Sequence, residues 1–128
     1  MSGLIPLVLV AEDDVILRYL AERQLSKLGY RCEVVENGAD ALKKVQEARF
    51  DLIFMDVQMP VMNGLESTSA IRKYEHDRGE SKATPIVAMT ANPNQQQCLE
   101  AGMNDFMFKP VSLESVKSMC LKWLGALK

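Results

Sequence analysis

Hydrophobic residues along the chain fall into two alternating patterns. One pattern is a short apolar run, found at residues 7–11, 52–55 and 86–89. Uninterrupted runs of this length are typical of strands that are buried on both faces of a sheet. A more mixed run at residues 31–35 and a short apolar run at residues 106–108 complete a set of five expected strands. The first of these combines charged and apolar residues, which suits a strand at the edge of a sheet.

Between these runs the apolar residues recur at helical spacing. The expected helices cover residues 15–28, 39–48, 64–74, 93–101 and a final segment from residue 113, whose apolar stripe continues to Leu127. Gly29 and Gly102 stand where a left-handed residue commonly ends a helix, and Ser112 is the expected N-cap of the last one. The polar stretch 76–84 predicts a solvated connection that contains His76.

Five strands that are each followed by a helix predict an α/β fold of the (βα)5 type, with a doubly wound, five-stranded parallel sheet. Right-handed crossovers leave few topologies for such a chain, and the flavodoxin-like strand order 2-1-3-4-5 is among them. The length of 128 residues suits a single domain over residues 1–128, and no linker, repeat or low-complexity tract divides it.

Composition narrows the class of protein. Apolar residues make up 48% of the chain and the formal net charge is −2, without any basic run. These values fit a folded soluble domain and argue against direct binding of nucleic acid. No apolar stretch approaches the roughly 20 residues of a membrane span, and the amino terminus does not resemble a signal peptide. Cys32, Cys98 and Cys120 lack metal-site spacing and are expected to be reduced thiols, which predicts a cytoplasmic location.

Polar side chains follow four of the five expected strands. They are Glu12, Asp13 and Asp14 after the first strand, Asp56 after the third, Thr90 after the fourth and Lys109 after the fifth. In the 2-1-3-4-5 order these four strands are neighbours, so we expect the side chains to converge on one crevice at the carboxyl edge of the sheet.

The residue types in this crevice predict a phospho-aspartate site. Several crowded carboxylates favour a bound cation, and Mg²⁺ prefers oxygen ligands while leaving positions for phosphate oxygens. Mn²⁺ is the alternative ion. The carboxylate of Asp56 can act as a nucleophile toward phosphorus. Lys109 and the hydroxyl of Thr90 would then balance charge on the transferred oxygens.

Four stretches of the chain resemble the receiver domains of two-component response regulators, the family of the bacterial chemotaxis regulator. They are residues 7–13, 51–64, 87–92 and 106–110. The resemblance implies a signalling switch and not an enzyme, phosphorylated by a histidine kinase or a histidine phosphotransfer protein. The segments around residues 59–64 and 90–92 are most similar to receivers of hybrid histidine kinases. The chain is therefore interpreted as either a stand-alone regulator or a receiver from a hybrid kinase or phosphorelay.

The same resemblance implies a metal site around the phosphoacceptor Asp56. Its protein ligands would be Glu12, Asp13, Asp56 and the backbone carbonyl of Gln58. The acidic run allows two registers, Glu12-Asp13 or Asp13-Asp14. Strand alignment favours the first, with Asp14 at the start of the following helix.

The resemblance also implies the parts of the switch. Thr90 would be the switching hydroxyl, Lys109 the phosphoryl-binding lysine, and the Lys109–Pro110 peptide bond would be cis. Phe106 occupies the position of the switch aromatic, which is usually tyrosine, so a hydroxyl hydrogen bond is not available at the end of its swing. His76 is not expected to be the phosphodonor, which must then be another protein.

Three other functions are alternatives to a phosphorylated receiver. A phosphohydrolase of the haloacid dehalogenase type would place its nucleophile after the first strand in a DxDx[TV] pattern, which is absent here. A nucleotide-binding flavodoxin-like protein would have a glycine-rich phosphate loop at that position. A degenerate receiver that serves only as a docking module is the third alternative, and an inability to bind Mg²⁺ or to accept phosphate would favour it.

Overall fold

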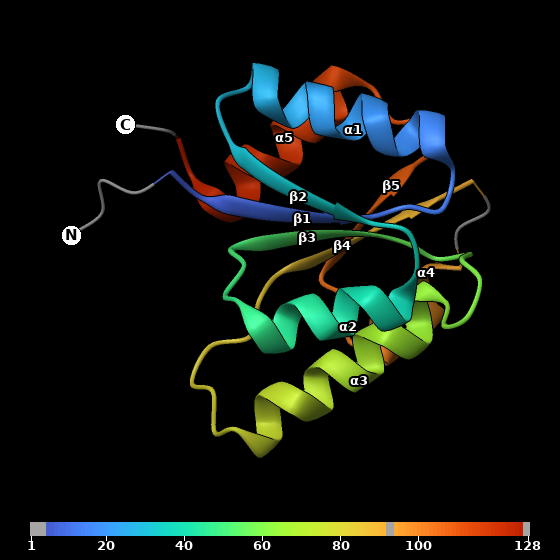
Figure 1. The fold of residues 1–128 in the computed structure, drawn as a ribbon, viewed down its shortest axis with the longest axis vertical. Helices are drawn as coiled ribbons and strands as arrows, with labels where there is room; N and C mark the ends of the chain where they lie inside the picture. The colour runs from blue at the N-terminus through green and yellow to red at the C-terminus, as the bar shows by residue number, and fades with distance from the viewer. Residues whose placement is uncertain (1–4, 92–93, 127–128) are drawn as a thin grey trace.

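The computed structural model describes residues 5–91 and 94–126. Strands and helices alternate along these residues (Figure 1). In chain order they are β1 (Leu7–Ala11), α1 (Val15–Lys27), β2 (Arg31–Val35), α2 (Gly38–Glu47), β3 (Leu52–Asp56), α3 (Gly64–Asp77), β4 (Ile86–Thr90), α4 (Gln95–Ala101), β5 (Asp105–Phe108) and α5 (Leu113–Leu124). The strands form one parallel sheet in the order β2-β1-β3-β4-β5. The predicted α/β fold, its strand order and the edge position of residues 31–35 are therefore confirmed.

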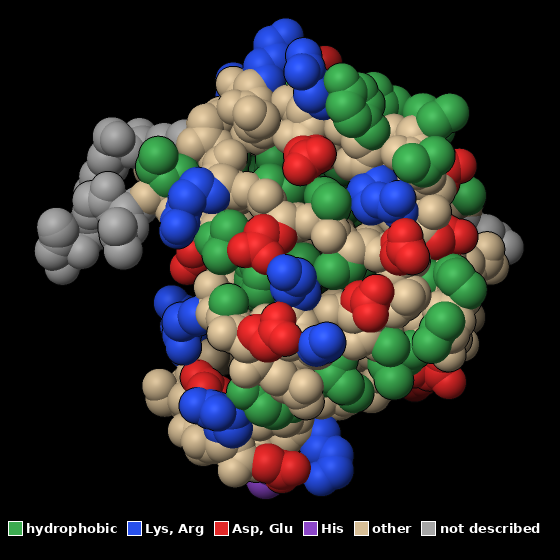
Figure 2. Space-filling view, viewed as in Figure 1, with side chains coloured by type: hydrophobic (Ala, Val, Ile, Leu, Met, Phe, Trp, Pro, Cys, Tyr) green, Lys and Arg blue, Asp and Glu red, His purple; other side chains and the backbone are tan. Residues whose placement is uncertain are grey.

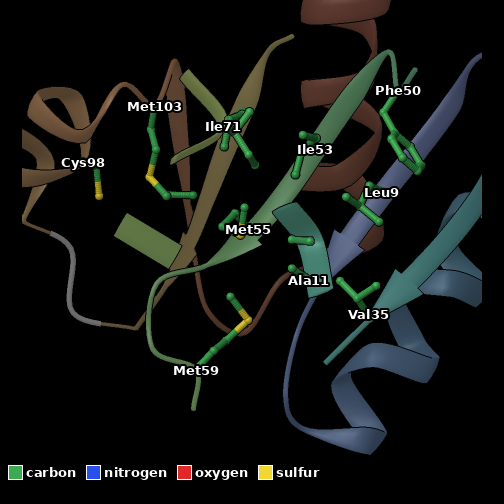
Figure 3. Packing of buried hydrophobic residues seen from close by; sticks show 13 residues of the cluster. Leu9, Ala11, Val35, Phe50, Ile53, Met55, Met59, Ile71, Cys98 and Met103 are labelled. Atoms are coloured by element: carbon green, nitrogen blue, oxygen red, sulfur yellow. The ribbon is translucent and has the colours of Figure 1, made fainter. Parts of the chain in front are cut away.

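Helices cover both faces of the sheet. In Figure 1, α1 and α5 lie on one face, and α2, α3 and α4 lie on the other. Side chains of β1 alternate between the two layers: Val8 and Val10 join the apolar cluster under α1 and α5, whereas Leu9 and Ala11 join the cluster under α2, α3 and α4. Figure 3 shows this second cluster, in which side chains from β1, β3, α3 and α4 pack together. The buried strands thus separate two apolar layers, as expected for a doubly wound sheet.

Helix α3 is longer than the sequence pattern predicts. It continues three residues beyond its expected end at Tyr74, so His76 belongs to the last helical turn and its placement in a connection is wrong. Glu75 is buried and accepts hydrogen bonds from Arg72 and from the backbone N–H of Thr84, at 2.8 and 2.9 Å. These contacts hold the last turn in place although the apolar spacing has ended. The side chain of His76 is 90% exposed, so it is solvated as expected.

The other helix ends agree closely with the sequence pattern. Helices α1 and α2 match their expected ranges to within one residue at each end. Gly29 and Gly102 have φ angles of 97° and 107°, the left-handed conformation expected after α1 and α4. The side chain of Ser112 caps α5 by accepting a backbone hydrogen bond at 3.1 Å. Pro93, expected to begin the helix over residues 93–101, and Leu127, expected on the stripe of α5, lie outside the described residues.

The three cysteines are free thiols, as expected. Burial raises the pKa of Cys32 and that of Cys120 to about 12. Because the thiolate is the reactive form of cysteine, both side chains stay protonated and unreactive near neutral pH. Over residues 5–91 and 94–126, each helix is too short or too polar to span a bilayer.

One residue in the loop between β3 and α3 has a strained backbone. Val61 has a φ of 67°, and it is 84% exposed. A β-branched residue rarely adopts this left-handed conformation, which costs roughly 1–3 kcal/mol.

Replacing Val61 with asparagine is expected to raise the free energy of unfolding by about 1 kcal/mol, because asparagine tolerates the left-handed conformation. Urea denaturation measures the change. Val61→Thr is the matched control, since threonine is polar but keeps the branched Cβ. An equal gain in both variants would show that the benefit comes from removing an exposed apolar side chain and not from relieving strain.

Candidate functional site

Three charged side chains meet at the carboxyl edge of the sheet. Glu12 directly follows β1, Asp56 ends β3, and Lys109 directly follows β5. The Nζ atom of Lys109 lies 2.9 Å from Glu12 Oε1 and 3.0 Å from Asp56 Oδ2. Both acids are buried, with exposed fractions of 2% for Glu12 and 4% for Asp56. The site is therefore built on two buried carboxylates that one ammonium group bridges.

Strand alternation places these three side chains on one face of the sheet. Side chains two positions apart in an extended chain point to the same side. The residues two positions before the three charged groups all belong to the apolar cluster under α1 and α5; they are Val10, Phe54 and Met107. Glu12, Asp56 and Lys109 therefore lie on the same face of the sheet as this cluster, at the carboxyl ends of β1, β3 and β5.

Asp13 completes a cluster of carboxylates. One carboxylate oxygen from each of Glu12, Asp13 and Asp56 lies within 4.8 Å of the others. The two oxygens of Glu12 are already engaged, by Lys109 at 2.9 Å and by the backbone N–H of Asp14 at 3.1 Å. Asp13 is exposed and lies on the solvent side of the cluster, whereas Asp56 is buried and lies on its inner side. Mg²⁺ takes one or two carboxylates and keeps several waters, and this donor set fits it.

Burial and pairing shift the ionisation of the two residues that form the bridge. Burial raises the pKa of Glu12 to about 7, although hydrogen bonds from Lys109 and from the backbone of Asp14 act in the opposite direction. Burial alone would lower the pKa of Lys109, but its hydrogen bonds to Glu12 and Asp56 outweigh this, and the pKa lies above its usual value of 10.5. Lys109 therefore keeps its positive charge at neutral pH.

The loop between β3 and α3 shapes the backbone around Asp56. The backbone N–H of Gln58 donates to Asp56 Oδ1 at 3.2 Å. The N–H of Gly64 donates to the carbonyl of Val57 at 2.9 Å, and its Cα packs directly against the carbonyl of Asp56. A Cβ atom at position 64 would overlap with that carbonyl, so only glycine lets α3 begin this close to the site.

The charged cluster lies in an open cleft that brings the expected phosphorylation and metal residues together. Its lining includes Glu12, Asp13, Asp56, Gln58, Thr90 and Lys109. Thr90 is buried at the end of β4, and its carbonyl accepts a hydrogen bond from the backbone N–H of Lys109 at 2.9 Å. The Lys109–Pro110 peptide bond is cis, as expected. The individual roles, including the Gln58 carbonyl as a metal ligand, stay predictions.

Phe106 lies apart from this cleft. It is half-buried, it packs against the apolar cluster under α2, α3 and α4, and it is paired with Ala88 in the register of β4 and β5. Its ring meets the ring of Phe108 edge to face, with 5.5 Å between the centroids. Phe108 is itself 57% exposed. The aromatic that was expected to swing is thus held by a second, exposed aromatic, which the sequence pattern did not single out.

The hydrophobic pattern also missed a contact made by Arg18. Its guanidinium donates to the backbone carbonyl of Glu12 at 2.8 Å. The only signal in the sequence is an arginine four residues after Asp14, a spacing that indicates no more than a shared helix face. The contact depends on the path of the loop between β1 and α1, which the spacing of residues does not specify.

An apolar surface borders the cleft on α1. Four large side chains in its first half are exposed, and they are Val15, Ile16, Tyr19 and Leu20. Figure 2 shows hydrophobic side chains gathered on the part of the surface where α1 lies in Figure 1. A small, mostly apolar hollow that Leu20, Pro110 and Val111 help to line continues this surface toward Lys109. Scattered exposed apolar residues are ordinary, but a contiguous group beside a polar cleft indicates a binding face.

Sequence comparison gives a match to one protein family. Residues 8–120 match the model of the response regulator receiver domain. The sensor protein GacS of Pseudomonas syringae pv. syringae is 38% identical over 128 residues, which cover 98% of this chain and 14% of GacS. Hybrid signal transduction histidine kinase G of Dictyostelium discoideum is 42% identical over 115 residues, which cover 86% of this chain and 3% of that kinase. The chain therefore spans only a small part of the length of these curated relatives.

Solved structures give the same result for the fold. The receiver domain of a sensor histidine kinase from Pseudomonas aeruginosa, with a magnesium ion coordinated in its active site cleft, superposes with a TM-score of 0.85 at 34% identity and covers 96% of this chain and 100% of its own. The receiver domain of Ssk1 from Saccharomyces cerevisiae, crystallised with the histidine phosphotransfer protein Ypd1, gives a TM-score of 0.86 at 33% identity, with 94% of this chain and 91% of that chain covered.

Proposed function

The chain belongs to the response regulator receiver domain family, and we propose that Asp56 accepts a phosphoryl group from a phosphohistidine donor, with Mg²⁺ bound beside it. The observation that carries the proposal is the buried carboxylate of Asp56, which lies 3.0 Å from Lys109 in an open cleft and within 4.8 Å of two further carboxylates. Mn²⁺, which also takes oxygen ligands, is the alternative ion.

The transfer is a substitution at phosphorus. A carboxylate oxygen of Asp56 attacks the phosphorus atom, and an acyl phosphate bond forms as the phosphorus–nitrogen bond of the donor breaks. The electron pair of the broken bond stays on the donor imidazole. Lys109 balances negative charge on the oxygens that move. Glu12, Asp13, Asp56 and the backbone carbonyl of Gln58 would hold Mg²⁺, which would supply further charge neutralisation at the phosphoryl oxygens.

Phosphorylation changes the charge in the cleft and, through it, the surface. The acyl phosphate adds negative charge and acceptor oxygens, toward which the hydroxyl of Thr90 and the ammonium of Lys109 move. The segment after β4 moves with Thr90. This movement changes the space that is open to the ring of Phe106, which lies beside Ala88 in the neighbouring strand. Because Phe106 packs on Phe108, its movement ends in altered ring packing and not in a hydroxyl hydrogen bond.

The phosphodonor is a histidine kinase or a histidine phosphotransfer protein. Support comes from the relatives, which are hybrid histidine kinases, and from the similar Ssk1 receiver that was crystallised with Ypd1. His76 is not the donor, because it lies in the last turn of α3, whereas the first turn of that helix adjoins Asp56. We place the exchange in the cytoplasm, in keeping with three reduced cysteines.

The proposal is tested by intact mass after incubation with acetyl phosphate and Mg²⁺. The wild type is expected to gain one phosphoryl group that hydroxylamine removes, and Asp56→Asn is expected to gain none. Asp51→Asn is the matched control, because Asp51 is an exposed aspartate that precedes β3, at the opposite edge of the sheet. An adduct on the Asp56→Asn variant would refute Asp56 as the acceptor. A wild type that binds Mg²⁺ but takes no phosphate from either acetyl phosphate or a protein donor would be a docking module.

We further propose that the donor covers the apolar surface of α1, because a phosphohistidine that reaches Asp56 must enter the cleft beside it. Tyr19→Ala is expected to slow transfer from a protein donor at least tenfold, about 1.4 kcal/mol, since exposed tyrosines are common anchors of interfaces. Transfer from acetyl phosphate should stay unchanged. Leu121→Ser on α5 is the control, because Leu121 is also exposed. Equal losses with both donors would show that Tyr19 supports the cleft and not the docking.

A further inference from the structure

Arg18 holds the loop that carries two of the three clustered carboxylates. Its Nη1 atom lies 2.8 Å from the carbonyl oxygen of Glu12 and 3.4 Å from that of Asp13. Its Nη2 atom lies 3.8 Å from Glu36 Oε2, just after β2, and only 18% of the Arg18 side chain is exposed. The guanidinium is thus packed between the loop after β1 and the loop after β2, behind the backbone that presents the acids.

The contact matters most for Asp13. The neighbouring residues are fixed by other means: the backbone N–H of Glu12 donates to the carbonyl of Val35 at 3.1 Å, and the side chain of Asp14 caps α1. Asp13 is exposed, so packing does not hold its side chain. Where its carboxylate points therefore depends on how the backbone at residue 13 is held, and Arg18 contacts that backbone at its carbonyl oxygen.

We infer that Arg18 is a positioning residue for the divalent cation: it fixes the backbone of Glu12 and Asp13 so that their carboxylates face Asp56. The inference rests on the proposed function, because it requires that the cluster binds a cation. An arginine suits this task, since a planar guanidinium donates to two carbonyl oxygens at once and still reaches a carboxylate. A lysine at the same position would keep the charge but lose this geometry.

Positioning and charge predict opposite effects on cation binding. A positive charge close to a cation site repels the cation, so removing the charge alone would strengthen binding. Loss of the backbone contacts would weaken binding, because the carboxylates would have to be ordered when the cation arrives. The sign of the change therefore separates the two roles.

The test is the dissociation constant for Mn²⁺, measured by electron paramagnetic resonance of the free ion, for wild type, Arg18→Lys and Arg18→Gln. Both variants are expected to bind Mn²⁺ about tenfold more weakly, as is typical when groups that orient metal ligands are removed. The same substitutions at Arg23 are the matched controls. Arg23 lies on the same helix, with its guanidinium 5.9 Å from the centre of the Tyr19 ring. Its substitutions should leave the dissociation constant for Mn²⁺ unchanged.

A second readout separates positioning from catalysis. The Mg²⁺ concentration for half-maximal phosphorylation by acetyl phosphate is expected to rise about tenfold in Arg18→Lys, while the rate at saturating Mg²⁺ equals that of wild type. Wild-type affinity in folded Arg18→Lys, or tighter binding in Arg18→Gln, would overturn the inference. If circular dichroism shows that Arg18→Gln does not fold, Arg18→Lys alone decides. A wild type that binds no Mn²⁺ would overturn the proposed function as well, whereas unchanged binding in Arg18→Lys overturns only the role of Arg18.

Discussion

Replacing Lys109 with glutamine is expected to slow phosphorylation of Asp56 about 100-fold, while Mg²⁺ binds more tightly. The rate falls because the ammonium that balances charge on the moving phosphoryl oxygens is lost, and removal of one such group typically costs 10²–10³-fold. In the wild type, the Nζ atom of Lys109 lies 2.9 Å from Glu12 Oε1 and 3.0 Å from Asp56 Oδ2, and it neutralises both carboxylates. Without this ammonium group the two carboxylates need another positive partner, so they bind the cation more tightly. Acetyl phosphate kinetics and Mn²⁺ titration measure the two effects.

Lys122→Gln is the matched control for this pair of measurements. Lys122 is also ion-paired, 2.7 Å from Asp105, but it lies on α5 outside the cleft. The Lys122→Gln substitution should change neither the rate of phosphorylation nor the affinity for the cation. If Lys109→Gln weakened cation binding and slowed phosphorylation together, Lys109 would be acting mainly to hold the cleft in shape, and the charge-balancing role would be wrong.

The positions of the main site residues follow from the sequence because parallel strands share one carboxyl edge. Once the apolar runs define five strands, the residues just after them must gather at that edge. Alternation adds a second constraint, since Glu12, Asp56 and Lys109 each stand two positions after an apolar residue of the same layer. Because the three side chains point to the same face of the sheet, Lys109 can form ion pairs with Glu12 at 2.9 Å and with Asp56 at 3.0 Å.

The features that the sequence pattern missed depend on contacts between polar side chains of a helix and the backbone of the adjoining loop. The end of α3 is held by Glu75, which accepts a hydrogen bond from the backbone of Thr84 nine residues later. Arg18 of α1 donates to the backbone of the loop that precedes this helix, six residues earlier in the chain. Periodicity reports which face of an element is apolar, but it does not report where a long polar side chain finds its partner.

Exposed apolar residues of α1 are a further feature that helical spacing alone does not reveal. Leu17 and Leu20 share the helical spacing that predicts a buried stripe, yet Leu17 is half-buried and Leu20 is 47% exposed. Residues of α1 that face away from the sheet are also apolar, so the helix has no clear polar side at its first half. The sequence pattern does not distinguish an exposed apolar binding surface from a buried core, because both consist of the same residue types.

Mg²⁺ is expected to stabilise the wild-type domain, and Asp13→Asn is expected to abolish this effect. At a free Mg²⁺ concentration 100 times its dissociation constant, the free energy of unfolding should rise by about 2.7 kcal/mol. In the absence of divalent cations Asp13→Asn should be at least as stable as wild type, because one of three crowded negative charges is removed. Urea denaturation with and without Mg²⁺ measures both values, and the order of stability of the two proteins should reverse.

Asp14→Asn is the control that distinguishes the two registers of the acidic run. The side chain of Asp14 accepts hydrogen bonds from the backbone of Ile16 and Leu17 at 2.9 and 3.0 Å, and asparagine caps a helix as well as aspartate does. This variant loses the same charge as Asp13→Asn but should keep the full stabilisation by Mg²⁺. If Asp14→Asn lost the effect and Asp13→Asn kept it, the metal would be bound in the second register. Loss in both variants would mean that the summed charge of the loop, and not a specific ligand, attracts the cation.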